Sequence, residues 1–187
     1  EKANFTYVRQ QKMLGLGHAI LTGELLIGNE PFAVVLADDL CISGNKNLLM
    51  EMNEVYKKHQ CSIIAIEEIP AEKTSSYGII SGELIEGTKD TFLVTDMVEK
   101  PEPKDAQSNL GIIGRYILTP EIFNILRDTK PDKKGEIQIT DALRTQAKNE
   151  KVIAYKFKGE RFDCGSVSGY LDAIFHMCQA IIPHMKR

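Results

Sequence analysis

Short apolar runs alternate with segments of helical periodicity through the first 70 residues of the chain. Residues 5–10, 32–37 and 61–69 are predicted strands. Between them, residues 14–27 and 45–60 carry apolar side chains at helical spacing. The run at 32–37 is apolar on both faces, which is typical of a central strand in a sheet covered by helices. Strands that are joined through helices imply crossover connections and therefore parallel pairing.

After Pro70 the pattern changes from crossovers to a hairpin. Ser81 and Gly82 interrupt two extended segments within residues 77–87, which predicts a hairpin with a two-residue turn. Further elements are expected as strands over 91–101, 109–119 and 151–159 and as helices over 120–129, 136–150 and 166–182. We therefore predict an α/β fold: a doubly wound, mainly parallel sheet with an inserted antiparallel portion, in a single domain that covers residues 1–187.

Composition and charge narrow the class of partner. The chain has 187 residues, 43% of them hydrophobic, and a formal net charge of −3 with both signs mixed throughout. It shows neither the basic stripe of a nucleic-acid-binding protein nor a polybasic membrane anchor, and no apolar run approaches the ~18 residues that span a bilayer. Cys41, Cys61, Cys164 and Cys178 lie far apart, which argues against a zinc site or a disulfide framework. We expect a cytoplasmic protein with small molecules or other protein chains as partners.

Two adjacent carboxylates, Asp38 and Asp39, follow the apolar run at 32–37 directly. In open α/β sheets, ligands bind outside the carboxyl ends of the parallel strands. A carboxylate at that place can hold Mg²⁺, which prefers oxygen ligands and keeps waters or phosphates in its other positions. The alternative is that the pair begins a solvated turn or caps the next helix, and spacing alone leaves both interpretations open.

Three more charged residues fall at the ends of predicted strands or just before a helix. Glu99 and Lys100 end a strand that Pro101 stops; a glutamate suits sugar hydroxyls and a lysine suits a phosphate. Taken by itself, the pair fits a charged surface turn better. Asp163 stands just before the helix at 166–182, where it is either a turn or cap residue or one ligand of a site whose partner carboxylate comes from elsewhere.

Glycines at two places would allow a ligand to approach the backbone. Gly15 lies close to the start of a predicted helix, shortly after Gln10, and Gly78 lies near the start of a predicted strand. The segment around Gly15 lacks the ending of a phosphate-binding loop and the full dinucleotide fingerprint. Each of these signals is weak when taken alone.

Taken in order, seven strings resemble the bacterial UTP:glucose-1-phosphate uridylyltransferases, also called UDP-glucose pyrophosphorylases. They are VRQQKMLGLGHA, FAVVLADDL, SYGII, MVEKP, SNLGIIGRY, GEIQITDAL and DCGSVSGY. The resemblance covers nearly the whole chain, and seven motifs in the right order are far more specific than any single one. It implies the nucleotidyltransferase variant of the doubly wound α/β fold.

The resemblance also assigns roles to the candidate residues. It implies that Asp38 and Asp163 bind Mg²⁺, that Gln10 and Gly15 contact the uracil, that Gly78, Glu99 and Ile112 line the glucose, and that Lys100 meets the sugar phosphate. Asp39 is the neighbour of Asp38 in the same loop, without a certain role. Glu136 and Asp141 are expected to support the sugar side, without an assigned contact.

The implied reaction joins UTP and glucose 1-phosphate into UDP-glucose and pyrophosphate. Because the sugar phosphate itself attacks, no protein nucleophile is needed, which agrees with the carboxylates and lysine that the sequence offers. The family carries a glycine-rich G-x-G-T-R segment around the triphosphate, and this sequence has no such stretch. We therefore expect an N-terminally truncated chain, which on its own could be inactive.

Two alternative functions and the oligomeric state remain open at this point. One is a thymidylyltransferase that acts on the same sugar phosphate. The other is a non-catalytic nucleotide-sugar binding module in which the glycine-rich segment is naturally missing. The resemblance further implies a homo-oligomer that associates through helices late in the chain.

Overall fold

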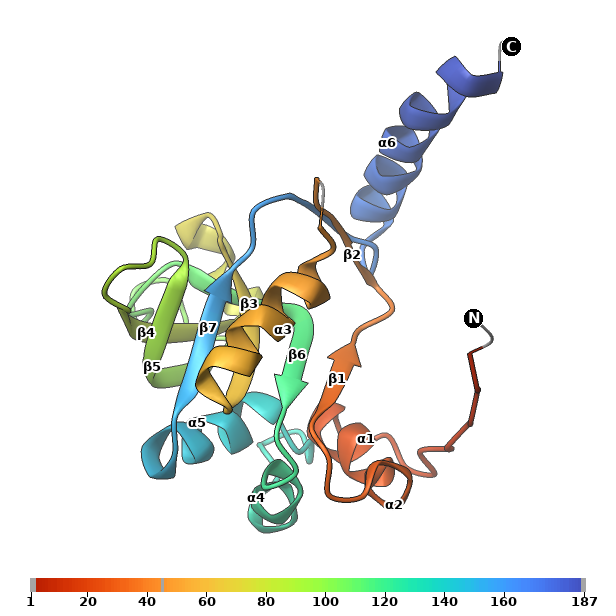
Figure 1. Cartoon of the computed structure of the whole chain (residues 1–187). Coiled ribbons are helices and arrows are strands. Elements are labelled where there is room, and N and C mark those ends of the chain that lie inside the picture. Colours follow the sequence, from red (N-terminus) through yellow and green to blue (C-terminus); the bar gives the residue numbers. More distant parts are fainter. Residues whose placement is uncertain (1–2, 45, 186–187) are drawn as a thin grey trace.

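The computed structural model describes residues 3–44 and 46–185 of the chain (Figure 1). Six strands form one sheet in the order β1-β6-β3-β7-β5-β4, and two more form a small separate sheet, β2-β8. The large sheet consists of β1 (Phe32–Val35), β3 (Ser62–Glu68), β4 (Gly78–Leu84), β5 (Thr91–Glu99), β6 (Leu110–Leu118) and β7 (Val152–Lys156). The small sheet consists of β2 (Asp39–Ile42) and β8 (Glu160–Asp163). The helices are α1 (Leu16–Thr22), α2 (Glu24–Ile27), α3 (Leu48–His59), α4 (Ile122–Asp128), α5 (Ile139–Asn149), α6 (Val167–Met185) and the short 3₁₀ helix η1 (Ala71–Ser76).

Helices cover both faces of the large sheet, as β3 shows most directly. Successive side chains of a strand point to opposite faces. Ile64 and Ile66 of β3 belong to a core cluster with residues of α1, α4 and α5, whereas Ile63 and Ala65 belong to a second cluster with residues of α3. All four of these side chains are fully buried. The predicted α/β class, with helices on both faces of the sheet, is confirmed.

The directions of the strands follow the prediction in part. The pairings give β1, β3, β4 and β7 one direction and β5 and β6 the other. Four of the six strands therefore point the same way, but only β3 and β7 are parallel neighbours among the described residues. Direct pairing is less parallel than the sequence suggested, because β6 lies between β1 and β3 and runs against both.

Three local predictions need correction. Residues 5–10 form neither strand nor helix, and Tyr7 within them is 91% exposed. Ser81 and Gly82 lie inside a continuous β4, where the register shifts in a bulge, and the chain turns only after Leu84. A Cβ on Gly82 would come within 2.7 Å of the Leu93 carbonyl oxygen, so the glycine marks a close approach of two backbones rather than a turn. Finally, β1 is an edge strand of the described sheet and not a central one.

The last part of the chain returns to the first. β8 pairs antiparallel with β2, and Asp163 lies opposite Asp39. From there α6 runs away from the sheet (Figure 1). Among the helices that the structure describes, none combines the length and apolar character that crossing a membrane requires.

Candidate active site

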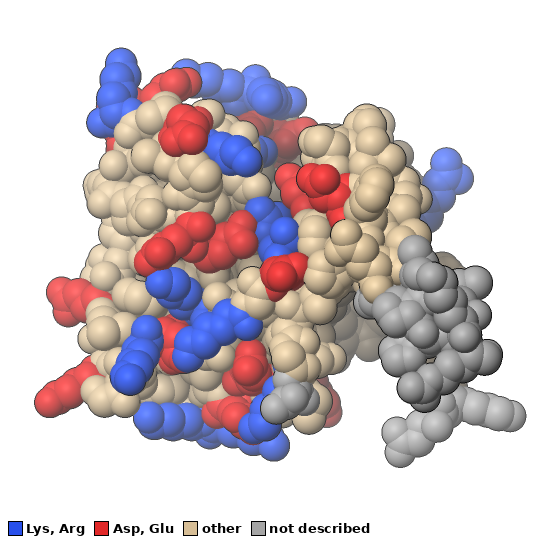
Figure 2. Space-filling view, turned by 90° about the horizontal axis from the view of Figure 1, so that it is seen from above, with Lys and Arg blue, Asp and Glu red and all other residues tan. Residues whose placement is uncertain are grey.

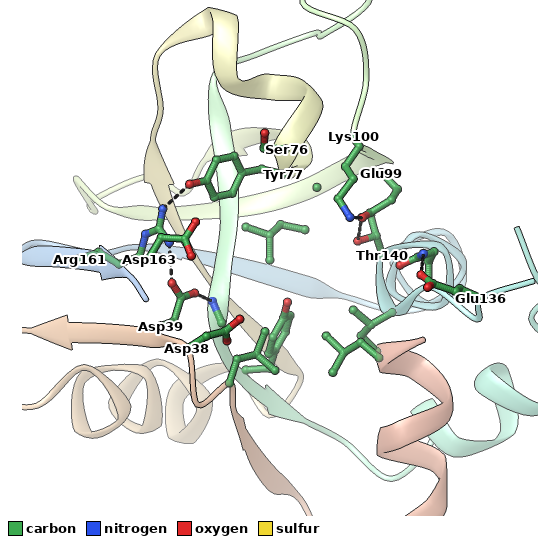
Figure 3. Close-up of a pocket in the computed structure, with 18 residues that line it drawn as sticks. Asp38, Asp39, Ser76, Tyr77, Glu99, Lys100, Glu136, Thr140, Arg161 and Asp163 are labelled. Carbon is green, nitrogen blue, oxygen red and sulfur yellow. Dashed lines mark hydrogen bonds and ion pairs between the residues drawn. The ribbon is translucent and has the colours of Figure 1, made fainter. Parts of the chain in front are cut away.

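A cavity of ≈ 350 Å³ opens where the ends of several strands meet. Six of the residues singled out in the sequence line this cavity: Asp38, Gly78, Glu99, Lys100, Ile112 and Asp163. The strand topology explains the convergence. β4 pairs with β6 through Ile79 and Gly111 and with β5 from Gly78 to Leu84. This brings the start of β4 and the end of β5 to β6, which Asp39 at the start of β2 also contacts, and β8 pairs with β2. Figure 3 shows Asp38 and Asp163 on one side of the cavity and Glu99 and Lys100 on the other.

The two carboxylates on the first side face one small space. Asp38 lies in the turn between β1 and β2, and Asp163 ends β8. A Cβ built on Gly165 would lie 3.1 Å from Asp163 Oδ1 and 3.3 Å from Asp38 Oδ2. The backbone N–H of Cys164 also donates to the Asp38 carbonyl at 2.7 Å. Asp38 is therefore the carboxylate that the fold brings close to Asp163.

Asp38 and Asp39 are adjacent in sequence but have different environments. Asp38 is exposed, whereas the Asp39 side chain is only 11% exposed. Asp39 Oδ2 accepts a hydrogen bond from the Gly114 N–H at 2.6 Å, and Asp39 Oδ1 accepts one from Arg161 Nη1 at 2.5 Å. Arg115 adds hydrogen bonds to the Leu36 and Asp39 carbonyl oxygens. Asp39 thus anchors the turn, and Asp38 is the carboxylate that the turn presents to the cavity.

The opposite side is organised around Glu99. Thr140 Oγ1 donates to Glu99 Oε2 at 2.6 Å, and Lys100 Nζ lies 3.2 Å from Glu99 Oε1. Lys100 has φ 47°, a left-handed conformation that non-glycine residues rarely adopt, and its N–H donates to the Tyr77 carbonyl at 3.0 Å. A Cβ on Gly78 would lie 2.9 Å from Thr140 Oγ1 and 3.2 Å from Glu99 Oε2, so only glycine leaves this corner open.

The other sequence candidates lie at or beyond the rim. Glu136 lines the cavity and accepts a hydrogen bond from Gln138, but Asp141 is not among the lining residues. Gln10 and Gly15 do not line the cavity either; Gln10 Nε2 donates to the Gly15 carbonyl at 3.2 Å. Gly15 has φ 90°, and a Cβ there would lie 2.9 Å from Glu136 Cβ. This contact places the Gln10–Gly15 segment beside the cavity wall.

The cavity is acidic, which decides what it can bind. Five carboxylates and two cations line it; these are Asp38, Asp39, Glu99, Glu136 and Asp163, with Lys100 and Arg161. A phosphate would be repelled there unless a metal cation came with it. Residues 3–44 and 46–185 contain no cluster of three or more potential metal-ligating side chains. A pair of carboxylates nevertheless fits a hard divalent cation that takes its other oxygens from water and phosphate.

Several lining residues were not singled out from the sequence, among them Tyr77, Thr140 and Arg161. Thr140 lies near the start of the helix predicted at 136–150, and Arg161 lies just after the strand predicted at 151–159, but the pattern gave neither residue a role. Their roles depend on contacts with residues far away in the chain, for which the sequence offered no signal. Burial raises the pKa of Tyr116, another lining residue, and the nearby charges of Glu99 and Asp39 raise it further, so its hydroxyl stays protonated.

Comparison with known protein families agrees with this geometry. The model of the nucleotidyl transferase family matches residues 1–180, so the chain belongs to this family. Within it, the chain is 58% identical over 174 residues to a UTP–glucose-1-phosphate uridylyltransferase of Pseudomonas aeruginosa, and the match covers 92% of this chain. The protein of that name from Streptococcus pyogenes is 44% identical over 173 residues, which is 90% of this chain.

Solved structures give the same picture. The crystal structure of a UDP-glucose pyrophosphorylase complexed with UDP-glucose is 60% identical, with a TM-score of 0.92 over 96% of this chain and 68% of that one. A UTP-bound UGPase from Acinetobacter baumannii is 37% identical, with a TM-score of 0.81 over 91% of this chain and 58% of that one. The chain spans 62% of the length of the Pseudomonas relative and 56% of the Streptococcus relative.

Proposed function

We propose that this chain carries the sugar and metal side of a nucleotidyltransferase that forms UDP-glucose and pyrophosphate from UTP and glucose 1-phosphate. The observation that carries the proposal is the convergence of Asp38 and Asp163 with Glu99 and Lys100 in one cavity. The similarity to uridylyltransferases and UDP-glucose pyrophosphorylases supports the choice of substrates. These relatives also favour uridylyl over thymidylyl transfer, and an enzyme over a binding module.

The proposed reaction needs alignment more than it needs reactive side chains. A phosphate oxygen of glucose 1-phosphate attacks the α-phosphorus of UTP and forms a new P–O bond. The bond from that phosphorus to the bridging oxygen breaks, and pyrophosphate leaves with the electron pair. Lys100 would hold the sugar phosphate, while Glu99 accepts hydrogen bonds from sugar hydroxyls beside Gly78 and Ile112.

Asp38 and Asp163 would hold a divalent cation, which we propose to be Mg²⁺. When bound, such a cation neutralises phosphate charge that the acidic cavity would otherwise repel. Gln10 and Gly15 would contact the uracil from the adjacent rim, where the left-handed backbone at Gly15 allows a close approach. All of these groups lie within residues 1–187, which we propose to form one domain.

The test is formation of UDP-glucose from UTP, glucose 1-phosphate and Mg²⁺, followed by mass spectrometry. The assay is run on this chain and on the longest protein encoded by the gene that contains it, with dTTP as the competing nucleotide. UDP-glucose made in preference to dTDP-glucose by either protein supports the proposal. If neither protein makes a nucleotide sugar, the proposal is wrong.

We also propose a cytoplasmic location and self-association. The four cysteines are all free thiols, which suits a reducing compartment; they are Cys41, Cys61, Cys164 and Cys178.

Self-association is supported by α6, which carries exposed apolar side chains from Val167 to Met177 on a helix that leaves the sheet. On the face seen in Figure 2, Lys and Arg are interspersed with Asp and Glu, so we propose no nucleic-acid partner for it.

A further inference from the structure

Arg161 is a buried cation at the edge of the candidate active site. Its side chain is 7% exposed. Nε donates to Glu67 Oε1 at 2.6 Å, Nη1 donates to Asp39 Oδ1 at 2.5 Å, and Nη2 donates to the Tyr77 hydroxyl at 2.6 Å. The guanidinium carbon also lies 5.2 Å from the centre of the Tyr77 ring. Nη2 also lies 2.6 Å from Glu67 Oε1, so every nitrogen of this side chain has at least one polar partner.

The three partners of Arg161 come from three different segments of the chain, and two of these segments also carry a candidate site residue. Asp39 follows Asp38, and Tyr77 precedes Gly78. Arg161 itself stands two residues before Asp163 on β8, so both side chains point to the same side of the strand (Figure 3). Through Asp39 and the Tyr77 hydroxyl, one guanidinium thereby connects the turn that carries Asp38 and the strand that ends at Asp163 with the segment before Gly78.

Charge balance alone does not explain this arrangement. A lysine would place the same single positive charge beside Asp39 and Glu67, but its compact ammonium on a flexible stem cannot hold three partners in fixed directions, as a planar guanidinium does. What Arg161 supplies beyond its charge is therefore the fixed direction of its three contacts. The segments it joins are far apart in the chain: Arg161 comes 94 positions after Glu67 and 122 positions after Asp39.

We propose that Arg161 is a positioning residue for the proposed uridylyl transfer: it fixes the spacing of Asp38 and Asp163 and thereby sets their affinity for a divalent cation. This inference rests on the proposed function. Arg161 acts through Asp39, which anchors the turn that presents Asp38, and through its own strand, which ends at Asp163. Its contact with Tyr77 holds the backbone before Gly78 in the same framework.

Arg161→Lys tests the proposal, with Arg144→Lys as the matched control. Arg144 also forms a two-bond pair with a carboxylate, Asp96, at 2.6 and 2.9 Å, but it does not line the cavity. Mn²⁺ binding is measured by electron paramagnetic resonance without substrates, on the longest protein that contains the chain. Groups that orient metal ligands typically contribute 10–100-fold to metal affinity, so we expect Arg161→Lys to bind Mn²⁺ about tenfold more weakly and Arg144→Lys to bind it normally.

A second variant covers the case in which Arg161→Lys does not fold. Both carboxylate oxygens of Asp39 accept hydrogen bonds, and an asparagine can accept at only one of the two positions. Asp39→Asn should therefore weaken Mn²⁺ binding in the same direction while circular dichroism stays unchanged. The positioning role alone would be overturned if a variant that folds correctly binds Mn²⁺ with unchanged affinity while the unaltered protein makes UDP-glucose. If the unaltered protein neither binds Mn²⁺ nor makes UDP-glucose, both proposals are overturned.

Discussion

At the scale of single residues, the hydroxyl of Thr140 fixes the orientation of Glu99. Thr140 is 4% exposed and donates to Glu99 Oε2 at 2.6 Å, while Lys100 occupies the other carboxylate oxygen. A hydrogen bond to a charged group contributes about 1.5–3 kcal/mol net. We expect Thr140→Val, which keeps the shape and removes the donor, to raise the KM for glucose 1-phosphate about tenfold. Initial-rate kinetics at saturating UTP measure this effect.

The control for this prediction is Thr140→Ser, which keeps the donor and should stay close to the unaltered protein. The KM for UTP should not change in either variant, because Thr140 lies on the side of the cavity opposite Asp38 and Asp163 (Figure 3). A general loss of structure would affect both substrates and lower the melting temperature. Equal effects of valine and serine would show that the hydroxyl does not matter.

The residues named from the sequence and those missed differ in a physical way. Asp38 and Glu99 could be named because polar groups at strand ends are informative in an α/β fold. Position in the chain alone could not tell Asp38 from Asp39, which only the family resemblance separated, since their physical difference lies in burial and in the Gly114 N–H that bonds Asp39. Arg161 could not be named at all, because its meaning comes from partners far away in the chain.

At the scale of secondary structure, periodicity predicted most helices and strands but not which strands are neighbours. The chain forms α3, α5 and β6 close to where their apolar patterns place them. The small sheet of β2 and β8 was not predicted, because each strand has four residues and no clear alternation. Yet this sheet brings Asp38 and Asp163 together. Pairing between short strands distant in the chain is decided by the packed fold and leaves little local signal.

Helix α6 carries the prediction at this scale. Val167, Tyr170, Leu171, Ile174 and Phe175 are exposed by 41–80% and follow helical spacing along one side. Ala173 is buried, and the His176 ring lies 5.1 Å from the Phe162 ring, so a different side of the helix meets β8. An apolar face of this kind is typical of a protein interface. We expect the double variant Leu171→Glu, Phe175→Glu to lower the mass measured by light scattering to that of one chain.

The matched control is Gln179→Glu, which adds a negative charge to the same helix outside that apolar face. Gln179 is exposed and lies near Ser168 and Asp172 around the helix, where the side chains are polar. Its variant should keep the mass of the unaltered protein. An oligomer that survives the double variant, or a monomer before any change, would contradict association through this face.

At the scale of the whole molecule, folding stability should depend on two carboxylates in opposite ways. Burial and the nearby charge of Glu99 raise the pKa of Asp141 above its ordinary value of 3.8, despite the opposing effect of Arg144. The hydrogen bond from Arg144, by contrast, lowers the pKa of Asp96 below 3.8. Asp141 is therefore a carboxylate whose charge costs stability in the folded state, and Asp96 is one whose charge contributes to it.

The sign of the pH dependence follows from proton binding. With a raised pKa, folded Asp141 holds its proton more strongly than unfolded Asp141, so its charge starts to cost stability as the pH rises through 3.8 and costs most above its folded pKa. We expect Asp141→Asn to have the higher urea midpoint at pH 7.5, with a difference that shrinks toward pH 4. Asp96→Asn should have the lower midpoint at pH 7.5, with a difference that also shrinks as the pH falls. The opposite result is a urea midpoint of Asp141→Asn at pH 7.5 that is equal to or lower than that of the unaltered protein. It would mean that the charge of Asp141, in the first turn of α5, does not destabilise the fold, because its interaction with the helix start outweighs burial.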